Sequence, residues 1–81
     1  MTVRVRVFAS LRERLGRREM DCHVAEGATV ADLWQDLCAA HPGLTIVGSS
    51  ISFAVNHEYV EPVHRLRDGD ELAVIPPVSG G

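Results

Sequence analysis

One apolar stripe constrains the fold of this sequence more than any other feature. Apolar side chains recur at the i, i+3, i+4, i+7 and i+8 spacing of a single helical face, at Val30, Leu33, Trp34, Leu37 and Cys38. Thr29 followed by Asp32 is typical of a helix start. His41-Pro42-Gly43 should end the helix, because proline cannot continue the hydrogen-bond ladder and glycine accepts a left-handed conformation. A helix with one apolar face needs a sheet to cover.

Short segments with a period of two supply that sheet. Val3, Val5 and Val7 alternate with Arg4 and Arg6, which predicts a strand with one buried face. A second strand, carrying Met20, Cys22 and Val24, should return antiparallel to the first. Further strands are expected at 51–55 and 71–75, a glycine-closed helical turn at 10–16, a loop through 48–50, and turns at 56–59 and 68–70. Pro62 disfavours an interior strand after the 56–59 turn.

The order strand, strand, helix, strand, short strand, strand predicts an α+β fold. It fits a ubiquitin-like β-grasp roll, in which a mixed sheet packs on one main helix and the first and last strands run parallel in the centre of the sheet. We expect residues 1–75 to form the β-grasp domain and residues 76–81 to form an extended C-terminal functional tail.

Composition excludes several classes of function. A chain of 81 residues buries only roughly 60% of its unfolded surface, too little for a large catalytic cleft. Its net charge of −3 argues against nucleic acid as the main partner. No segment resembles a signal peptide or reaches membrane-spanning length, so we expect a cytoplasmic protein. All eight basic residues are arginine, through codon bias or to keep side-chain amines away from an activated C-terminus.

The candidate nucleophiles and metal ligands do not form a recognisable motif. Cys22 and Cys38 lie far apart, without a CxxC pair or a histidine at zinc spacing, and we interpret them as small core residues. The four histidines are scattered. Asp68 and Asp70 lack the further ligands that a metal needs. We therefore expect neither a metal nor a bound cofactor.

The C-terminal segment is the most informative part of the sequence. Pro76-Pro77 favours polyproline II, so the chain should leave the sheet at Ile75 in a stiff form, and six residues could reach roughly 18–20 Å. Gly80 and Gly81 lack Cβ atoms and could pass through a narrow channel. The alternative is a frayed terminus. We interpret the Gly81 carboxylate as the reactive group.

A free carboxylate must be activated before it can react, most simply as an acyl-adenylate made from ATP by a separate enzyme. A sulfur nucleophile could then displace AMP and leave a terminal thiocarboxylate. A lysine amine is the alternative acceptor, and would give an isopeptide bond. Sulfur transfer and conjugation both remain open at this point.

The chain resembles the MoaD family, the sulfur-carrier small subunits of molybdopterin synthase, over essentially its full length. The matching segments are Phe8–Glu13 with Gly16, Ala54–Asn56, Leu66–Ala73 and Pro76–Gly81. The thiamin carrier ThiS also ends in Gly-Gly, but it is typically shorter and lacks the Pro-Pro-Val-Ser-Gly-Gly ending.

The resemblance implies a role in molybdenum cofactor biosynthesis. A MoeB-type enzyme would adenylate Gly81, a sulfur donor protein would supply the sulfur, and the tail would enter the large subunit MoaE in a heterotetramer. Sulfur would pass there to precursor Z, cyclic pyranopterin monophosphate, so this chain would be the sulfur-donor subunit without a catalytic centre of its own. The alternative is a carrier or modifier for another thiolation pathway (thiamin or tRNA) or for protein conjugation.

Residue parity predicts the docking surface. With Val3, Val5 and Val7 facing the helix, Phe8 faces the other way and lies beside Ile75 of the parallel last strand. Such an exposed pair at the root of the tail would anchor a partner, unless Phe8 bends inward to pack the sheet edge. The full set of predicted partner-binding residues is Phe8, Ile75, Pro76, Pro77, Val78, Ser79, Arg4, Arg6 and Tyr59.

The polar members of this set have alternative interpretations. Arg4 and Arg6 could steer an acidic partner or be solvated charges on an open sheet. Tyr59 could extend the patch or face solvent.

Overall fold

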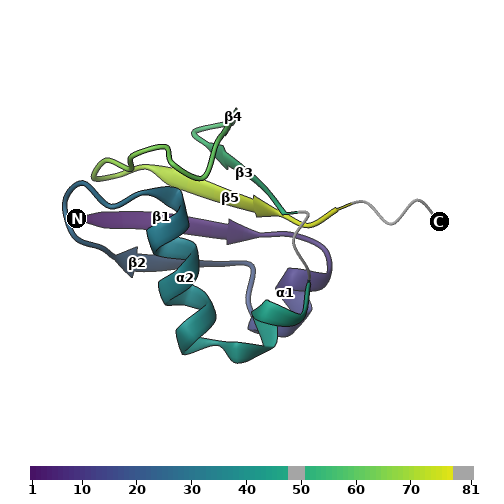
Figure 1. The fold of residues 1–81 in the computed structure, drawn as a ribbon. Helices are drawn as coiled ribbons and strands as arrows, with labels where there is room; N and C mark the ends of the chain where they lie inside the picture. The colour runs from purple at the N-terminus through teal and green to yellow at the C-terminus, as the bar shows by residue number, and fades with distance from the viewer. Residues whose placement is uncertain (48–50, 78–81) are drawn as a thin grey trace.

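The computed structural model describes residues 1–47 and 51–77 of the chain (Figure 1). In chain order the elements are β1 (Thr2–Val7), α1 (Ser10–Leu15), β2 (Glu19–His23), α2 (Val30–Ala40), the 3₁₀ helix η1 (Pro42–Val47), β3 (Ser52–Val55), β4 (Glu58–Val60) and β5 (Glu71–Ile75). The order of helices and strands follows the prediction, apart from η1.

The described strands form one mixed sheet in the order β2-β1-β5-β3-β4. β1 runs antiparallel to β2 and parallel to β5, with Val5 opposite Leu72 and Val7 opposite Val74. β5 pairs antiparallel with β3, which pairs with β4. The first and last strands are therefore central neighbours, as predicted, and the α+β β-grasp class is confirmed.

One face of this sheet is buried beneath α2 (Figure 1). Val3, Val5 and Val7 of β1 are at most 2% exposed, whereas Arg4 and Arg6 between them are exposed. The core they share with α2 and β5 includes Val30, Leu33, Leu37, Leu72 and Val74. Apolar burial of this kind is the main stabilising term in a small domain.

The remaining apolar positions of α2 pack at the margin of that core. Trp34 and Cys38 are half-buried, and the Trp34 ring meets Phe53 edge-on with 6.1 Å between ring centroids. The whole predicted stripe therefore packs on the core.

Local sequence signals set the ends of both α-helices. The Thr29 hydroxyl accepts from the Asp32 amide at 3.2 Å, and the Asp32 carboxylate accepts from the Thr29 amide at 3.0 Å. This reciprocal capping box satisfies two amides that have no partner within the helix. Gly16 ends α1 at φ 81°, a left-handed angle that glycine adopts without steric cost.

Two segments differ from the prediction. Residues 42–47, for which no helix was predicted, form η1, a 3₁₀ helix that apolar periodicity cannot indicate because it is so short. The loop predicted through 48–50 lies outside the described residues. The turn expected over 56–59 contains only Asn56 and His57, with φ angles of 50° and 72°. Two left-handed residues make the tight turn that matches strand twist, so Glu58 and Tyr59 belong to β4.

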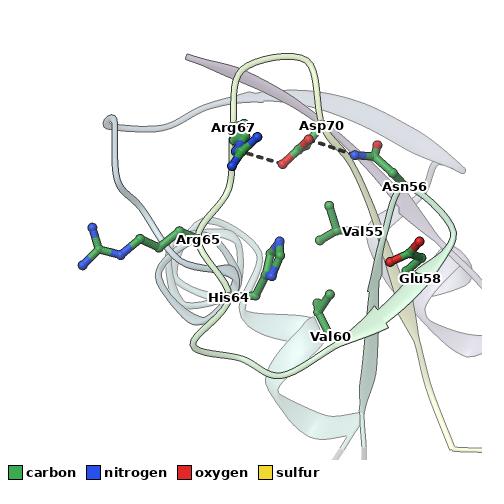
Figure 2. Close-up of a pocket in the computed structure, with 8 residues that line it drawn as sticks. All are labelled: Val55, Asn56, Glu58, Val60, His64, Arg65, Arg67 and Asp70. Carbon is green, nitrogen blue, oxygen red and sulfur yellow. Dashed lines mark hydrogen bonds between the residues drawn. The ribbon is translucent and has the colours of Figure 1, made fainter.

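Asp70 joins three segments of the chain, as Figure 2 shows in part. Its carboxylate is buried and accepts from the Arg67 amide at 2.8 Å and from Asn56 Nδ2 at 2.9 Å, while its carbonyl accepts from the Arg4 amide at 2.9 Å. The neighbouring Asp68 carboxylate accepts from the Thr2 amide at 2.8 Å. The predicted 68–70 turn thus ties the start of β5 to β1 and to the β3–β4 hairpin.

We expect Asp70→Ala to lower the free energy of unfolding by about 2 kcal/mol, because it leaves two donors without their charged acceptor. Chemical denaturation measures the change. Asp36→Ala is the matched control, since Asp36 is exposed on α2, and it should shift stability by no more than about 0.5 kcal/mol. Equal stability of the two variants would contradict the proposed role of Asp70.

Candidate functional site

An apolar hollow of about 350 Å³ lies on the face of the sheet opposite α2. It is lined by Phe8, Ala54, His57, Tyr59, Ala73 and Ile75, which we call the open-face patch. Phe8 directly follows Val7, the residue paired with Val74, so parallel pairing brings Phe8 and Ile75 to the same end of the sheet. The predicted juxtaposition of these two residues is present in the structure.

Most side chains of this patch are accessible to a partner, although Ala54 is buried. Phe8 and Ile75 are half-buried, and Tyr59 is 75% exposed. Phe8 therefore shares a hollow with outward-facing residues and is not withdrawn into the core. Tyr59 borders the same hollow from β4, so it extends the patch while facing solvent. Exposed apolar groups gathered around one hollow are typical of a protein-binding surface.

Arg4 and Arg6 lie on this open face, but acidic neighbours compensate their charges. Arg4 Nε is 3.3 Å from Asp21 Oδ1, and Arg6 Nη1 is 3.1 Å from Glu71 Oε1. Both arginines also lie 3.8 Å from Glu19. The Arg6 guanidinium lies 5.7 Å from the centre of the Phe8 ring. These contacts hold the arginines against the sheet and leave little free positive charge there for steering.

The root of the tail lies at the end of β5. The strand ends at Ile75 as predicted, but Pro76 is buried and Pro77 is the first exposed residue beyond it. Pro76 therefore still packs against the domain although it lies beyond the end of the strand. Val78, Ser79, Gly80 and Gly81 lie outside the described residues.

Cys22 and Cys38 are unpaired and half-buried, and His57 is a surface residue with Nε2 3.8 Å from Glu71 Oε2. Within residues 1–47 and 51–77, no three His, Cys, Asp or Glu side chains gather in a way that could hold a metal. No helix in this part of the chain is long and apolar enough to cross a membrane.

A second hollow, of about 490 Å³, lies beside the β3–β4 hairpin (Figure 2). Asp70 and Asn56 in its wall are hydrogen-bonded to each other, while the Arg65 side chain extends away from it. It borders the 68–70 turn, where β5 begins, and so lies at the opposite end of that strand from the tail. The open-face patch is therefore the better candidate for a site that works with the tail.

Comparison with known proteins decides the family. The ThiS family model matches residues 5–81, which is nearly the whole chain. This chain belongs to the ThiS family.

Individual members of the ThiS family are similar over the full length of the chain. The molybdopterin synthase sulfur carrier subunit of Chlamydomonas reinhardtii is 45% identical, with 100% of both chains covered. The human protein of the same name is 43% identical, covering 98% of this chain and 93% of the human one. Both support the MoaD resemblance, because both bear the name of the sulfur carrier subunit of molybdopterin synthase.

The fold agrees with that of a solved structure. The crystal structure of small archaeal modifier protein 1 from Haloferax volcanii superposes with a TM-score of 0.88 at 35% identity, covering all of both chains. The ubiquitin-like β-grasp is thus shared with a protein whose name describes a modifier and not a sulfur carrier.

Burial raises the pKa of the Cys22 thiol, with a smaller contribution from Asp21, and also raises the pKa of the Cys38 thiol. We therefore expect both thiols to be alkylated more slowly at neutral pH than the thiol of an unstructured peptide, because the thiolate is the reactive form. Iodoacetamide labelling followed by mass spectrometry measures the rates. When urea unfolds the protein, both thiols should be alkylated as fast as the thiol of the peptide.

The same shifts make stability depend on pH. The folded state holds the thiol protons more tightly than the unfolded state does, so stability should fall as the pH rises above the unfolded thiol pKa of about 8.5. Thermal melts at several pH values measure this loss of stability. The Cys22→Ser/Cys38→Ser variant is the control, and its stability should not show the loss that comes from the thiols. Fast labelling of the folded protein would contradict the burial of these thiols.

Proposed function

We propose that this protein is the sulfur-carrier subunit of a molybdopterin synthase and carries sulfur as a thiocarboxylate on Gly81. The supporting observation is the full-length similarity to the Chlamydomonas carrier subunit, at 45% identity with complete coverage of both chains. The family match also extends through residue 81. An apolar patch at the root of the tail is the surface that such a carrier needs.

In the proposed reaction the Gly81 carboxylate attacks the α-phosphorus of ATP on a separate MoeB-type enzyme, and pyrophosphate leaves. A hydrosulfide ion supplied by a sulfur donor then attacks the acyl carbon, AMP leaves, and loss of the remaining thiol proton gives the thiocarboxylate. The resulting thiocarboxylate is a soft anionic nucleophile that can be delivered to a substrate. ATP is consumed by the activating enzyme, so this chain needs no bound cofactor.

The carrier supplies the sulfur and a partner supplies the catalytic groups. The open-face patch would pack on the large subunit, MoaE, while Pro77 and the residues after it lead Gly81 into the active site. Sulfur would pass there to precursor Z. We place this complex in the cytoplasm as a heterotetramer with two carriers, and the two unpaired cysteines suit a reducing compartment.

Loading of Gly81 is the direct test of this proposal. Incubation with ATP, a MoeB-type enzyme and a sulfur source should raise the intact mass by the difference between one sulfur and one oxygen atom. Deleting Gly81 should abolish the gain without unfolding the protein, whereas Cys22→Ser/Cys38→Ser should leave it unchanged. An active truncated protein would refute the scheme.

The open-face patch should affect binding to the large subunit without affecting the loading of sulfur onto Gly81. We expect Phe8→Ala/Ile75→Ala to weaken binding to the large subunit by at least about tenfold, as for the central apolar anchors of an interface. Val63→Ala is the matched control, because Val63 is 77% exposed but does not line the patch. Isothermal titration calorimetry measures both affinities. If the two variants lose the same amount of affinity for the large subunit, the patch is not part of the interface.

A second candidate function is protein modification. It is favoured by the TM-score of 0.88 to small archaeal modifier protein 1. In that case the activated Gly81 would be attacked by lysine amines. Because Arg67 is the last basic residue of the chain, trypsin would leave residues 68–81 attached to the modified lysines of other proteins. Finding such adducts without any thiocarboxylate would favour the modifier over the sulfur carrier.

A further inference from the structure

The eight arginines of this chain lie in three places: Arg4 and Arg6 on β1, Arg65 and Arg67 before the 68–70 turn, and four in or just after α1. Arg4 and Arg6 on the open face are paired with carboxylates. Arg12, Arg14, Arg17 and Arg18 are exposed, and none of their side chains forms an ion pair with a described residue. We call these four the α1 arginines. They carry four of the six arginine charges that have no ion-pair partner among the described residues.

The α1 arginines make the charge distribution strongly asymmetric. Residues 12–18 contain four arginines and one glutamate, a formal charge of +3. The whole chain carries −3, so the other 74 residues together carry −6. Such separation orients a small protein as it approaches a charged surface, and the attraction extends over the Debye length of about 10 Å at 0.1 M salt.

The fold puts this charge at the end of the sheet where the tail begins. β1 and β5 are parallel, and both point toward the side on which α1 lies (Figure 1). The Val7 amide at the end of β1 donates to the Arg18 carbonyl at 2.9 Å, and Val7 is paired with Val74. Phe8 of the open-face patch directly precedes the short link into α1. The segment that carries the α1 arginines therefore lies at the same end of the sheet as Phe8 of the patch and the root of the tail.

We propose that the α1 arginines form a steering surface for an acidic flank of the synthase large subunit, beside the entrance that receives the tail. This inference rests on the proposed function. A carrier that leaves its synthase to be reloaded must re-associate at every turnover, and steering raises the association rate without requiring a tight complex. A negative partner surface would attract the α1 end and repel the rest of the carrier.

A protein partner fits this arrangement better than a nucleic acid. An extended polyanion would approach the +3 segment but would also meet the −6 carried by the rest of the chain, and proteins that bind phosphate backbones usually have a net positive charge. A folded partner can place its acidic flank against the α1 arginines alone and an apolar surface against the patch. The two features thus specify one composite surface.

The test is the association rate with the large subunit, measured by stopped flow as a function of salt. Arg14→Glu/Arg17→Glu should slow association by roughly tenfold or more at about 50 mM salt and leave dissociation within about twofold. The difference should largely vanish near 0.5 M salt. Arg14→Gln/Arg17→Gln should show a smaller effect in the same direction, which keeps the test open if charge reversal impairs folding.

Arg65→Glu/Arg67→Glu is the matched control. It changes the net charge by the same amount, and its two exposed side chains, also without ion pairs among the described residues, lie near the 68–70 turn where β5 begins. It should slow association by no more than about threefold. If both double variants slow association equally, net charge and not position matters, and the inference is wrong.

The remaining outcomes separate this inference from the proposed function. If the unmodified protein is loaded with sulfur and binds the large subunit, but Arg14→Glu/Arg17→Glu associates normally, only the inference fails. The same holds if the variant is slowed only toward the activating enzyme, or loses only binding to a short DNA duplex. If the unmodified protein neither loads nor binds, the proposed function fails and the inference with it.

Discussion

The parallel pairing of β1 with β5 is the constraint on which the rest of the structure depends. It joins the first and last strands of the chain, with Val5 opposite Leu72 and Val7 opposite Val74. Because the strands are parallel, both end on the same side, so the link to α1 and the root of the tail emerge together. The 68–70 turn secures the other end, where the Asp70 carbonyl accepts from the Arg4 amide and the Gly69 amide donates to the Thr2 carbonyl. A carrier whose reactive group is on its tail requires such a fixed point of departure.

The sheet separates stability from recognition by giving each its own face. The valines of β1 face α2 and form the core, whereas the alternate residues face outward and form ion pairs or the open-face patch. Since successive side chains on a strand point to opposite faces, outward residues can change with little effect on the core. This arrangement suits a small domain that must remain folded while its surface meets several proteins in turn.

Most of the fold followed from local patterns. The Val3, Val5, Val7 alternation, the α2 stripe with its Thr29 cap, and the glycines at 16 and 69 each act over a few residues, so the sequence displays them directly. The 3₁₀ helix at 42–47 was missed because one or two turns have no measurable apolar period. The hairpin was placed too broadly because Asn56-His57 lacks the glycine that usually marks a two-residue turn. For the site, parity and parallel pairing were enough to bring Phe8 beside Ile75.

The sequence by itself determined the fold class, the buried face of each strand, and the tail that carries the proposed chemistry, because periodicity and chain order express these features without long-range information. Only the tertiary structure decided which charges are free. Arg4 and Arg6 form ion pairs with acidic residues of β2 and β5, whereas the α1 arginines have no ion-pair partner among the described residues. The structure also decided that Pro76, the first residue after β5, is buried. Ion pairing and burial depend on side chains that are distant in the chain, and a linear pattern cannot place them.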